Sequence, residues 1–347
     1  MSSSKFVLSY QMLNFGGLAV AALLLLTSPH LLILLIGGLV SAGVFLDSDV
    51  SMKLMERFGR KPEDSYLKGA VVWITGASSG IGEELAYRLS TAGAHLVLSA
   101  RNEKDLEAVA ESCRAHKCAS CLVVPMDITN YESHAKCLQQ VVDQHGKIDV
   151  LVNNAGVYQQ GFVLDTDLSV MRRVVEVDFM GHVSLSKLTA EHMRQTNTKG
   201  LVSFNASVAT MSTPHMGIYS ASKAALKCFA DSVRAEWFEY GIEVQVFRIG
   251  PVSTSLAERS LMTKENQVGG EKSVENFSKN YNPMTSKRCA ELMAVALANR
   301  VPEAWIVHKL MVVVAYMYEY APHTSRWLFG RRIAANMKKA DERLKKD

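Results

Sequence analysis

The stretch Val71-Val-Trp-Ile-Thr-Gly76-Ala-Ser-Ser-Gly80-Ile-Gly82 decides the fold of this chain. Its apolar first half predicts a buried strand, and the residues after Gly82 follow a helical pattern. Glycines at 76, 80 and 82 stand where the strand turns into the helix. Because they lack a Cβ atom, they permit a tight turn and the close approach of a diphosphate, which the helix N-terminus would bind. The alternative is a loop that merely turns, but a βαβ pattern surrounds this one.

The rest of the chain alternates apolar runs with helical patterns. The runs that predict strands are 70–75, 95–100, 121–125, 148–152, 201–206, 243–248 and 304–308. The helical patterns lie near 80–92, 103–116, 131–145, 167–196, 217–240 and 286–299. This alternation predicts an α/β fold, a Rossmann-like doubly wound parallel sheet of about seven strands that binds ligands beyond its carboxyl ends.

A tyrosine and a lysine stand four residues apart in Tyr219-Ser-Ala-Ser-Lys223, so on one helix they share a face. A phenol with a pKa of about 10 is a poor base at neutral pH, and a lysine ammonium beside it favours the phenolate. The pair could exchange a proton with a carbonyl or alcohol oxygen, and Ser207, twelve residues before Tyr219, could polarise that oxygen. On an arbitrary helix, such a pair is usually exposed to solvent and has no catalytic role. The serine and the glycine turn favour the catalytic interpretation.

With Asn153-Asn-Ala-Gly156 after the fourth apolar run, residues 68–310 resemble the short-chain dehydrogenase/reductase family, and in particular its membrane-anchored branch. The resemblance implies catalysis by Tyr219, Lys223 and Ser207, with Ser207 and Tyr219 also binding the substrate. It implies cofactor contacts from Gly76, Ser78, Ser79, Gly80, Ile81, Gly82, Arg101, Asp127, Asn154, Ala155, Gly156, Tyr219, Lys223, Pro251, Val252 and Thr254. It also places a substrate lid at about 254–285, where periodicity is lost; an ordinary surface insertion is the alternative.

The second predicted strand ends at Arg101. An acidic residue there would bond the ribose of NAD, whereas an arginine suits the 2′-phosphate of NADP. We therefore expect NADP(H) rather than NAD(H), the alternative being an arginine that only faces water. Asp127 resembles the family's adenine-facing aspartate and could equally cap the following helix.

Asp178 departs from the family pattern, which has an asparagine at this position. That asparagine helps to hold a helix distortion, and its carbonyl binds a water leading to the lysine. Aspartate is nearly isosteric, so we expect activity, but its charge could raise the pKa of Lys223 and alter the proton relay. The alternative function is a catalytically weakened nucleotide-binding membrane protein of the same fold.

Cys113, His116, Cys118 and Cys121 are spaced closely enough to suggest zinc. They run from a helix end into a strand, which would have to curl around the ion, so we expect free or buried cysteines and no metal. The other histidines that we considered have no partner spacing and are expected to be structural: His182, His192 and His215.

Residues 6–46 contain no charged side chain and exceed the about 20 residues that cross a membrane. We expect a retained anchor at 1–48, a single span or a hairpin, rather than a cleaved signal. A juxtamembrane linker at 49–67 and an apolar, then basic, extension at 311–347 would flank the 68–310 domain. Lysines and arginines gather after the anchor, which predicts that the domain is cytosolic. The resemblance to the membrane-anchored branch implies the endoplasmic reticulum membrane. The apolar run 310–318 would contact the monolayer, or pack on the sheet or in a dimer.

The formal charge of +4 is mild, and no basic stripe with interleaved aromatics appears, so nucleic acid is not an expected partner. Together these features predict an NADP(H)-dependent oxidoreductase that interconverts carbonyl and alcohol groups of a lipophilic substrate such as a steroid or retinoid. The expected partners are that small molecule and the membrane, with a second copy of the chain as a further candidate.

Overall fold

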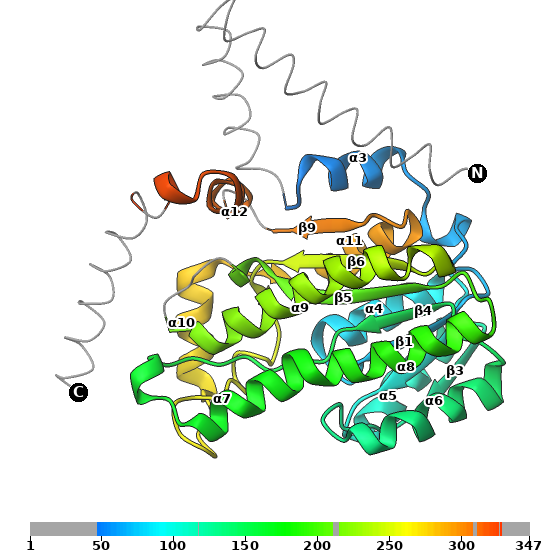
Figure 1. The fold of residues 1–347 in the computed structure, drawn as a ribbon, viewed down its shortest axis with the longest axis horizontal. Coiled ribbons are helices and arrows are strands. Elements are labelled where there is room, and N and C mark those ends of the chain that lie inside the picture. The colour runs from blue at the N-terminus through cyan, green and yellow to red at the C-terminus, as the bar shows by residue number, and fades with distance from the viewer. Residues whose placement is uncertain (1–46, 117, 211–214, 308–310, 326, 328–347) are drawn as a thin grey trace, which may run out of the picture. The chain divides into compact units, whose positions relative to one another are not determined.

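The computed structural model describes residues 47–116, 118–210, 215–307, 311–325 and 327. A parallel seven-stranded sheet in the order β3-β2-β1-β4-β5-β6-β9 forms its centre (Figure 1). The strands are β1 (Val71–Thr75), β2 (His95–Ser99), β3 (Ser120–Val123), β4 (Val150–Asn153), β5 (Leu201–Ser207), β6 (Glu243–Ile249) and β9 (Glu303–Ile306). Each lies within two residues of its predicted position, so the predicted Rossmann-like sheet is confirmed.

Helices cover both faces of the sheet, which is why its strands are continuous apolar runs. Buried side chains of α4 (Gly80–Thr91), α5 (Glu103–Ala115) and α11 (Ser286–Ala298) pack in one core. Those of α6 (Tyr131–His145), α8 (Gly181–Gln195) and α9 (Gly217–Glu236) pack in the other. The strand order reverses between β1 and β4, and at such a point the loops that leave the carboxyl ends diverge and open a cleft.

The long helix predicted at 167–196 is interrupted. It comprises α7 (Leu168–Val175), a π-helical turn η3 (Glu176–Met180) and α8. Single π turns inside α-helices occur frequently at functional sites. This one contains Asp178, so the helix distortion that the family resemblance implied lies at the expected residue.

The segment at 254–285 is more regular than its sequence predicts. It contains the helix α10 (Gly270–Tyr281) and lies between two short strands that pair with each other, β7 (Val252–Ser253) and β8 (Met284–Thr285). The expectation of a stretch without periodicity was wrong for α10, because the helix is largely polar and its apolar pattern is sparse. The β7–β8 pairing holds the two ends of the segment side by side.

Residues 49–67 are not a loose linker, which corrects the sequence-based expectation. They form α3 (Val50–Phe58) and a 3-10 turn η1 (Pro62–Asp64). The Asp49 carboxylate caps α3 by accepting a 2.7 Å hydrogen bond from the Met52 amide, and Met52 is fully buried. Arg288 of α11 donates to Asp47 and Glu56, which fastens α3 to the domain.

The last described helix, α12 (Met311–Tyr320), lies beside the edge strand β9 (Figure 1). Val312 and Ala315 are buried against Trp305 and Val307. Of the three alternatives for the apolar run 310–318, packing against the sheet is seen for the face that contains Val312 and Ala315. Within the described ranges, no helix combines the length and apolarity needed to cross a membrane. Of the predicted anchor at 1–48, residues 1–46 lie outside the described residues, as do the basic residues after 327.

Candidate active site

A cleft of about 2400 Å³ opens at the carboxyl ends of β1, β4, β5 and β6. It is lined by every predicted site residue except Gly82 and Asp178, which lie just behind its wall. The predicted residues that it brings together are Gly76, Ser78, Ser79, Gly80, Ile81, Arg101, Asp127, Asn154, Ala155, Gly156, Ser207, Tyr219, Lys223, Pro251, Val252 and Thr254.

The glycine turn is closed so tightly that side chains would not fit. Gly76 and Gly80 have φ angles of +65° and +64°, in the left-handed region that favours glycine. A Cβ atom on Gly82 would lie 2.4 Å from the Gly76 carbonyl oxygen, and one on Gly76 would lie 2.7 Å from Ala155 Cα. No side chain from these glycines stands between the N-terminus of α4 and the cleft, so a diphosphate could approach the first N–H groups of the helix.

A buried hydrogen-bond network joins the glycine turn to the neighbouring strand ends. The Asn154 side-chain amide donates to the carbonyl oxygens of Thr75 (2.8 Å) and Gly76 (3.1 Å). The Thr75 hydroxyl accepts from the backbone amides of Asn154 and Ala155 at 3.0 and 3.1 Å. The Asn205 side chain donates to Asn154 Oδ1 at 2.7 Å. The predicted segment 154–156 thus fixes β1, β4 and β5 to one another.

Ser207 and Tyr219 face each other across the cleft. Ser207 ends β5, where its hydroxyl donates to the Ile249 carbonyl (3.3 Å) and accepts from the Ala209 amide (3.1 Å). Tyr219 stands in the first turn of α9 and shares a hydrogen bond with Ser207. Burial raises the pKa of the tyrosine above its ordinary value, and the Asp178 carboxylate raises it further, while the bond to Ser207 lowers it. The phenol is therefore protonated at neutral pH.

The prediction that Lys223 favours the Tyr219 phenolate is not met in the structure. The Lys223 ammonium donates to the Asn205 carbonyl oxygen at 3.2 Å and lies 3.6 Å from Asp178 Oδ1. It stands 5.9 Å from the centre of the Tyr219 ring. Burial of the phenol raises the pKa of Tyr219 and the Asp178 carboxylate raises it further, so the shift is upward rather than downward.

Asp178 is fully buried in the π turn η3. Its Oδ1 accepts a 2.9 Å hydrogen bond from the Val157 amide, a bond that an asparagine oxygen would make equally well. Burial raises the pKa of the carboxyl, against the opposing effects of Lys223 and the Val157 amide. A Cβ atom on Gly156 would lie 3.0 Å from this oxygen, so the glycine gives the carboxylate its room.

His182 supports the same segment from behind. One ring nitrogen lies 2.8 Å from the Ala155 carbonyl oxygen and the other 3.3 Å from Asn153 Oδ1. Burial, together with the charge of Lys223, lowers the pKa of the imidazole to about 3. The histidine is therefore neutral, and its contacts are structural, as expected.

Arg101 and Asp127 lie at the far end of the cleft from Tyr219. Arg101 follows β2, is exposed and lines the cleft. Asp127 Oδ1 accepts from the amide and the hydroxyl of Thr129 at 2.9 and 2.8 Å, and Oδ2 lies 3.7 Å from Arg173. The aspartate thus stabilises the turn before α6 and lines the cleft, but it does not cap α6, whose N-cap residue is Asn130.

Among the cleft residues missed from the sequence, three polar ones join predicted site residues. Asn205 links Asn154 to Lys223, and Arg173 pairs with Asp127. Arg259, which follows β7, donates to the Ser79 hydroxyl of the glycine turn at 3.0 Å and adds a cation to the phosphate end. A polar residue inside an apolar strand is a signal that could have identified Asn205. The two arginines are brought to the cleft by the fold.

Cys113 is buried in the core, whereas Cys118 and Cys121 are partly exposed. A side-chain hydrogen bond joins Cys113 to Cys121 and, with burial, raises the pKa of the Cys113 thiol. In the described part of the chain, no group of three or more His, Cys, Asp or Glu side chains is arranged to hold a metal ion.

Residues 70–265 match the sequence model of the family described as short chain dehydrogenase. The chain belongs to the short-chain dehydrogenase/reductase family. Like other short-chain dehydrogenases/reductases it is an oxidoreductase acting on CH–OH and C=O groups, and the family typically uses a nicotinamide cofactor. The resemblance seen in the motifs is confirmed.

Among relatives, this family member is 38% identical over 299 residues to the human "Dehydrogenase/reductase SDR family member 7", covering 84% of this chain and 86% of the relative. It is 31% identical over 268 residues to "11-beta-hydroxysteroid dehydrogenase A" of Sesamum indicum, covering 75% and 74%. A Burkholderia phymatum short chain dehydrogenase/reductase, solved in complex with NAD, shares the fold with a TM-score of 0.66 at 24% identity, over 73% of this chain and 94% of that one.

We expect His182 to make stability depend on pH. The pKa of His182 in the folded protein, about 3, lies below the ordinary value of 6.5. The contribution of His182 to the free energy of unfolding is therefore present above pH 6.5 and is lost as the pH falls towards 3. Between pH 6.5 and 4.5 the free energy of unfolding should fall by about 2–3 kcal/mol more for the wild type than for His182→Gln. Urea unfolding of the full chain in mild detergent measures this, with His116→Gln, at an exposed position, as the control. Equal pH slopes for the wild type and His182→Gln would refute the assignment.

Proposed function

We propose that this chain is an NADP(H)-dependent enzyme that interconverts the carbonyl and alcohol groups of a lipophilic substrate. The observation that carries the proposal is the convergence of Ser207, Tyr219 and Lys223 on one cleft that also contains the glycine turn. The glycine turn offers a diphosphate site at one end of the cleft, and the hydroxyl pair offers a site for a reacting oxygen at the other.

In this mechanism, a substrate carbonyl oxygen lies between the Ser207 and Tyr219 hydroxyls. Ser207 donates a hydrogen bond that polarises the carbonyl, and Tyr219 donates the proton that the alkoxide needs. The nicotinamide cofactor, when bound, supplies or accepts the hydride. The protonated Tyr219 can donate in carbonyl reduction, and its phenolate can accept the proton in alcohol oxidation.

Lys223 and Asp178 form an ion pair beside the reacting hydroxyl groups. Lys223, fixed by the Asn205 carbonyl and paired with Asp178, would bond the ribose hydroxyls of the cofactor. The alternative function, nucleotide binding without turnover, rests on Asp178. The structure gives it little support because Asp178 accepts from Val157 as an asparagine would, and the π turn is intact.

Cationic groups at the other end of the cleft favour a phosphorylated ribose. Arg101 follows β2 at the end of the cleft where the adenosine would lie, and no acidic side chain occupies its position. The N-terminus of α4 and Arg259 would take the diphosphate. An arginine binds a 2′-phosphate well because its planar donors match phosphate geometry. We therefore propose NADP(H) over NAD(H).

The substrate end of the cleft is largely apolar, which suggests a lipid-like molecule. Its lining includes Tyr158, Met216, Leu261, Met262, Phe277, Met311 and Val314. Steroids and retinoids would match such a lining, and one relative carries the name of a hydroxysteroid dehydrogenase.

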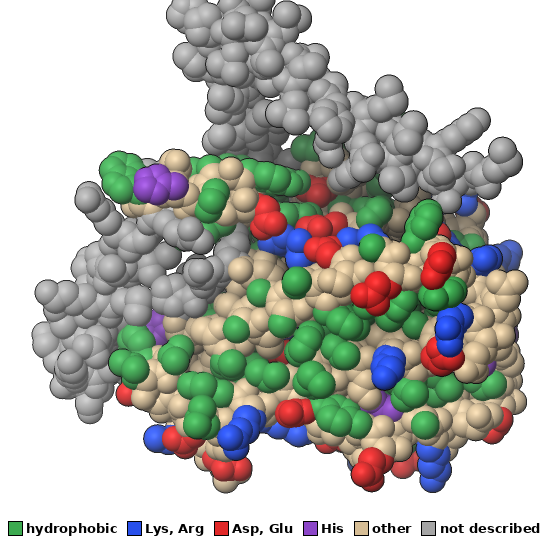
Figure 2. Space-filling view, viewed as in Figure 1, with side chains coloured by type: hydrophobic (Ala, Val, Ile, Leu, Met, Phe, Trp, Pro, Cys, Tyr) green, Lys and Arg blue, Asp and Glu red, His purple; other side chains and the backbone are tan. Residues whose placement is uncertain are grey.

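A membrane location would supply such substrates. The uncharged run 6–46 directly precedes α3, which exposes an apolar stripe of Val50, Leu54 and Phe58. Figure 2 also shows apolar side chains along α12, and many on the face that α8 and α9 form, where a second copy of the chain is a candidate partner. We propose an anchor in the endoplasmic reticulum membrane with the catalytic domain in the cytosol.

Tyr219→Phe should lower kcat by about 100-fold or more because it removes the general acid, and should change NADPH affinity little. The measurement is NADPH absorbance over a screen of lipophilic aldehydes, ketones and steroids. Tyr87→Phe is the matched control, because it loses a hydroxyl on α4 away from the cleft. Turnover by Tyr219→Phe at the wild-type rate would exclude the mechanism. A wild type that binds NADPH without turnover, and gains turnover in Asp178→Asn, would establish the alternative function.

Arg101→Gln should weaken NADPH binding about tenfold or more and leave NADH binding nearly unchanged, because only NADPH carries the 2′-phosphate. Fluorescence titration with each nucleotide measures both affinities. Arg114→Gln, on α5 and outside the cleft, is the charge-matched control. A wild-type protein that prefers NADH would contradict the proposed cofactor.

The topology is tested by adding protease to sealed microsomes that contain the full chain. We expect the catalytic domain to be digested without detergent and the protein to stay with the membrane after a carbonate wash. Protection of the domain until detergent is added would reverse the orientation. Release into the soluble fraction by carbonate would refute the anchor.

A further inference from the structure

The helix α12 uses two neighbouring faces for different contacts. Met311, Val314 and Tyr318, spaced as one side of a helix, line the cleft. Val312 and Ala315 are buried against Trp305 and Val307, beside Val208, the residue that follows Ser207. The helix is therefore both a wall of the cleft and a part of the packed edge of the sheet.

Aromatic stacking continues this packing. The Trp305 and Tyr316 rings stack at 4.7 Å with an angle of 5° between their planes, and Tyr316 stacks on Tyr320 at 5.8 Å. Hydrophobic burial is non-directional, and ring stacking adds a preference of only about 0.5–1.5 kcal/mol per pair, so these contacts alone select one orientation of α12 weakly. A polar contact is needed to fix one arrangement.

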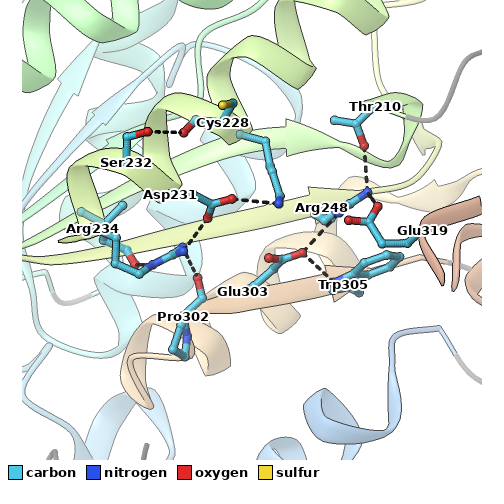
Figure 3. A network of polar contacts seen from close by, with 12 residues as sticks. Thr210, Cys228, Asp231, Ser232, Arg234, Arg248, Pro302, Glu303, Trp305 and Glu319 are labelled. Carbon is cyan, nitrogen blue, oxygen red and sulfur yellow. Dashed lines mark hydrogen bonds and ion pairs between the residues drawn. The ribbon is translucent and has the colours of Figure 1, made fainter. Parts of the chain in front are cut away.

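Arg248 of β6 provides that contact (Figure 3). Its side chain is 1% exposed, and its guanidinium lies 4.1 Å from the centre of the Trp305 ring. One terminal nitrogen donates to Glu319 of α12 at 3.1 Å and to the Thr210 hydroxyl at 2.8 Å, and the other donates to Glu303 at 3.4 Å. Glu303 also accepts from the Trp305 indole at 2.9 Å.

The position of Arg248 connects the helix to the reacting groups. Thr210 lies three residues after Ser207. The Arg248 nitrogen that donates to Thr210 also donates to Glu319, so it links the segment after Ser207 to α12. Glu319 is the one charged residue within α12. A rotation of the helix by one residue would turn Glu319 by about 100° and break the pair. A buried cation left with fewer partners is costly, so one orientation of α12 is favoured.

We propose that the Arg248–Glu319 ion pair seats α12 as the apolar wall of the substrate cleft and so determines how long a lipophilic substrate the enzyme binds well. Arg248 and Glu319 are positioning residues that act through Met311, Val314 and Tyr318. The inference rests on the proposed function, because it concerns the substrate end of that same cleft.

The test compares Glu319→Ala with the wild-type full chain in mild detergent, using straight-chain aldehydes from butanal to dodecanal. Each buried methylene should lower KM about three- to fourfold where the wall is in place. The variant-to-wild-type ratio of KM should stay near one for butanal and rise to about tenfold or more for dodecanal. The kcat values and the NADPH affinity should not change. Because both proteins meet the same micelles, aldehyde partitioning cancels in the ratio.

Two further variants and one exchange measurement separate this role from a general structural one. Glu111→Ala removes one acidic side chain from the exposed face of α5 and should give a ratio near one throughout. Glu319→Gln keeps the shape of the side chain and a weaker hydrogen bond. Its KM for the long aldehydes should therefore lie between those of Glu319→Ala and the wild type. Deuterium exchange should be faster over residues 311–320 in Glu319→Ala.

A KM ratio that is flat along the aldehyde series, or a loss of NADPH affinity in parallel, would overturn the inference while leaving the proposed function intact. If the wild type reduces none of the aldehydes, the proposed function loses its support instead. The exchange measurement then decides the inference, and unchanged exchange over α12 would overturn it.

Discussion

The structure depends on the hydrogen bonds that lock the carboxyl ends of β1, β4 and β5 together. The Thr75 hydroxyl accepts from two backbone amides of the next strand end, and the Asn154 amide reaches back to two carbonyls of the glycine turn. Asn205 continues the chain of contacts to Lys223. The diphosphate cradle and the lysine of the reacting end are therefore parts of one rigid unit, and neither can shift alone.

This unit also sets the electrostatics of the site. Burial raises the pKa of Tyr219, and the carboxylate of Asp178, which lies 3.6 Å from the Lys223 ammonium, raises it further. A buried pair of this kind contributes little net stability, because desolvation offsets the attraction. Its effect is to decide which of the surrounding groups carries a proton, and the π turn is the backbone feature that places the carboxylate there.

The sheet and the reacting groups were predictable from the sequence because their signals are local. Apolar runs mark buried strands, three glycines mark a turn that only glycine can make, and a four-residue spacing places Tyr219 and Lys223 on one helix face. Arg259 and the wall made by α12 could not be predicted, because tertiary packing brings them to the cleft from segments without a motif. The raised pKa of Tyr219 was not predicted, because the sequence shows Lys223 and Asp178 but not the burial of the phenol, which is the largest cause of the shift.

The cap that begins α3 has a consequence for the sheet edge. The Asp49 amide donates to the Trp305 carbonyl, so the chain ahead of α3 covers part of the outer side of β9, the last strand of the sheet. An uncovered strand edge is a template for pairing with other chains. A shortened version of the enzyme that begins where the family fold begins, near residue 68, would thus expose backbone that the longer chain shields. A truncation intended for purification or crystallisation is better made ahead of Asp47, which keeps the edge covered and the α3 ion pairs with Arg288 intact.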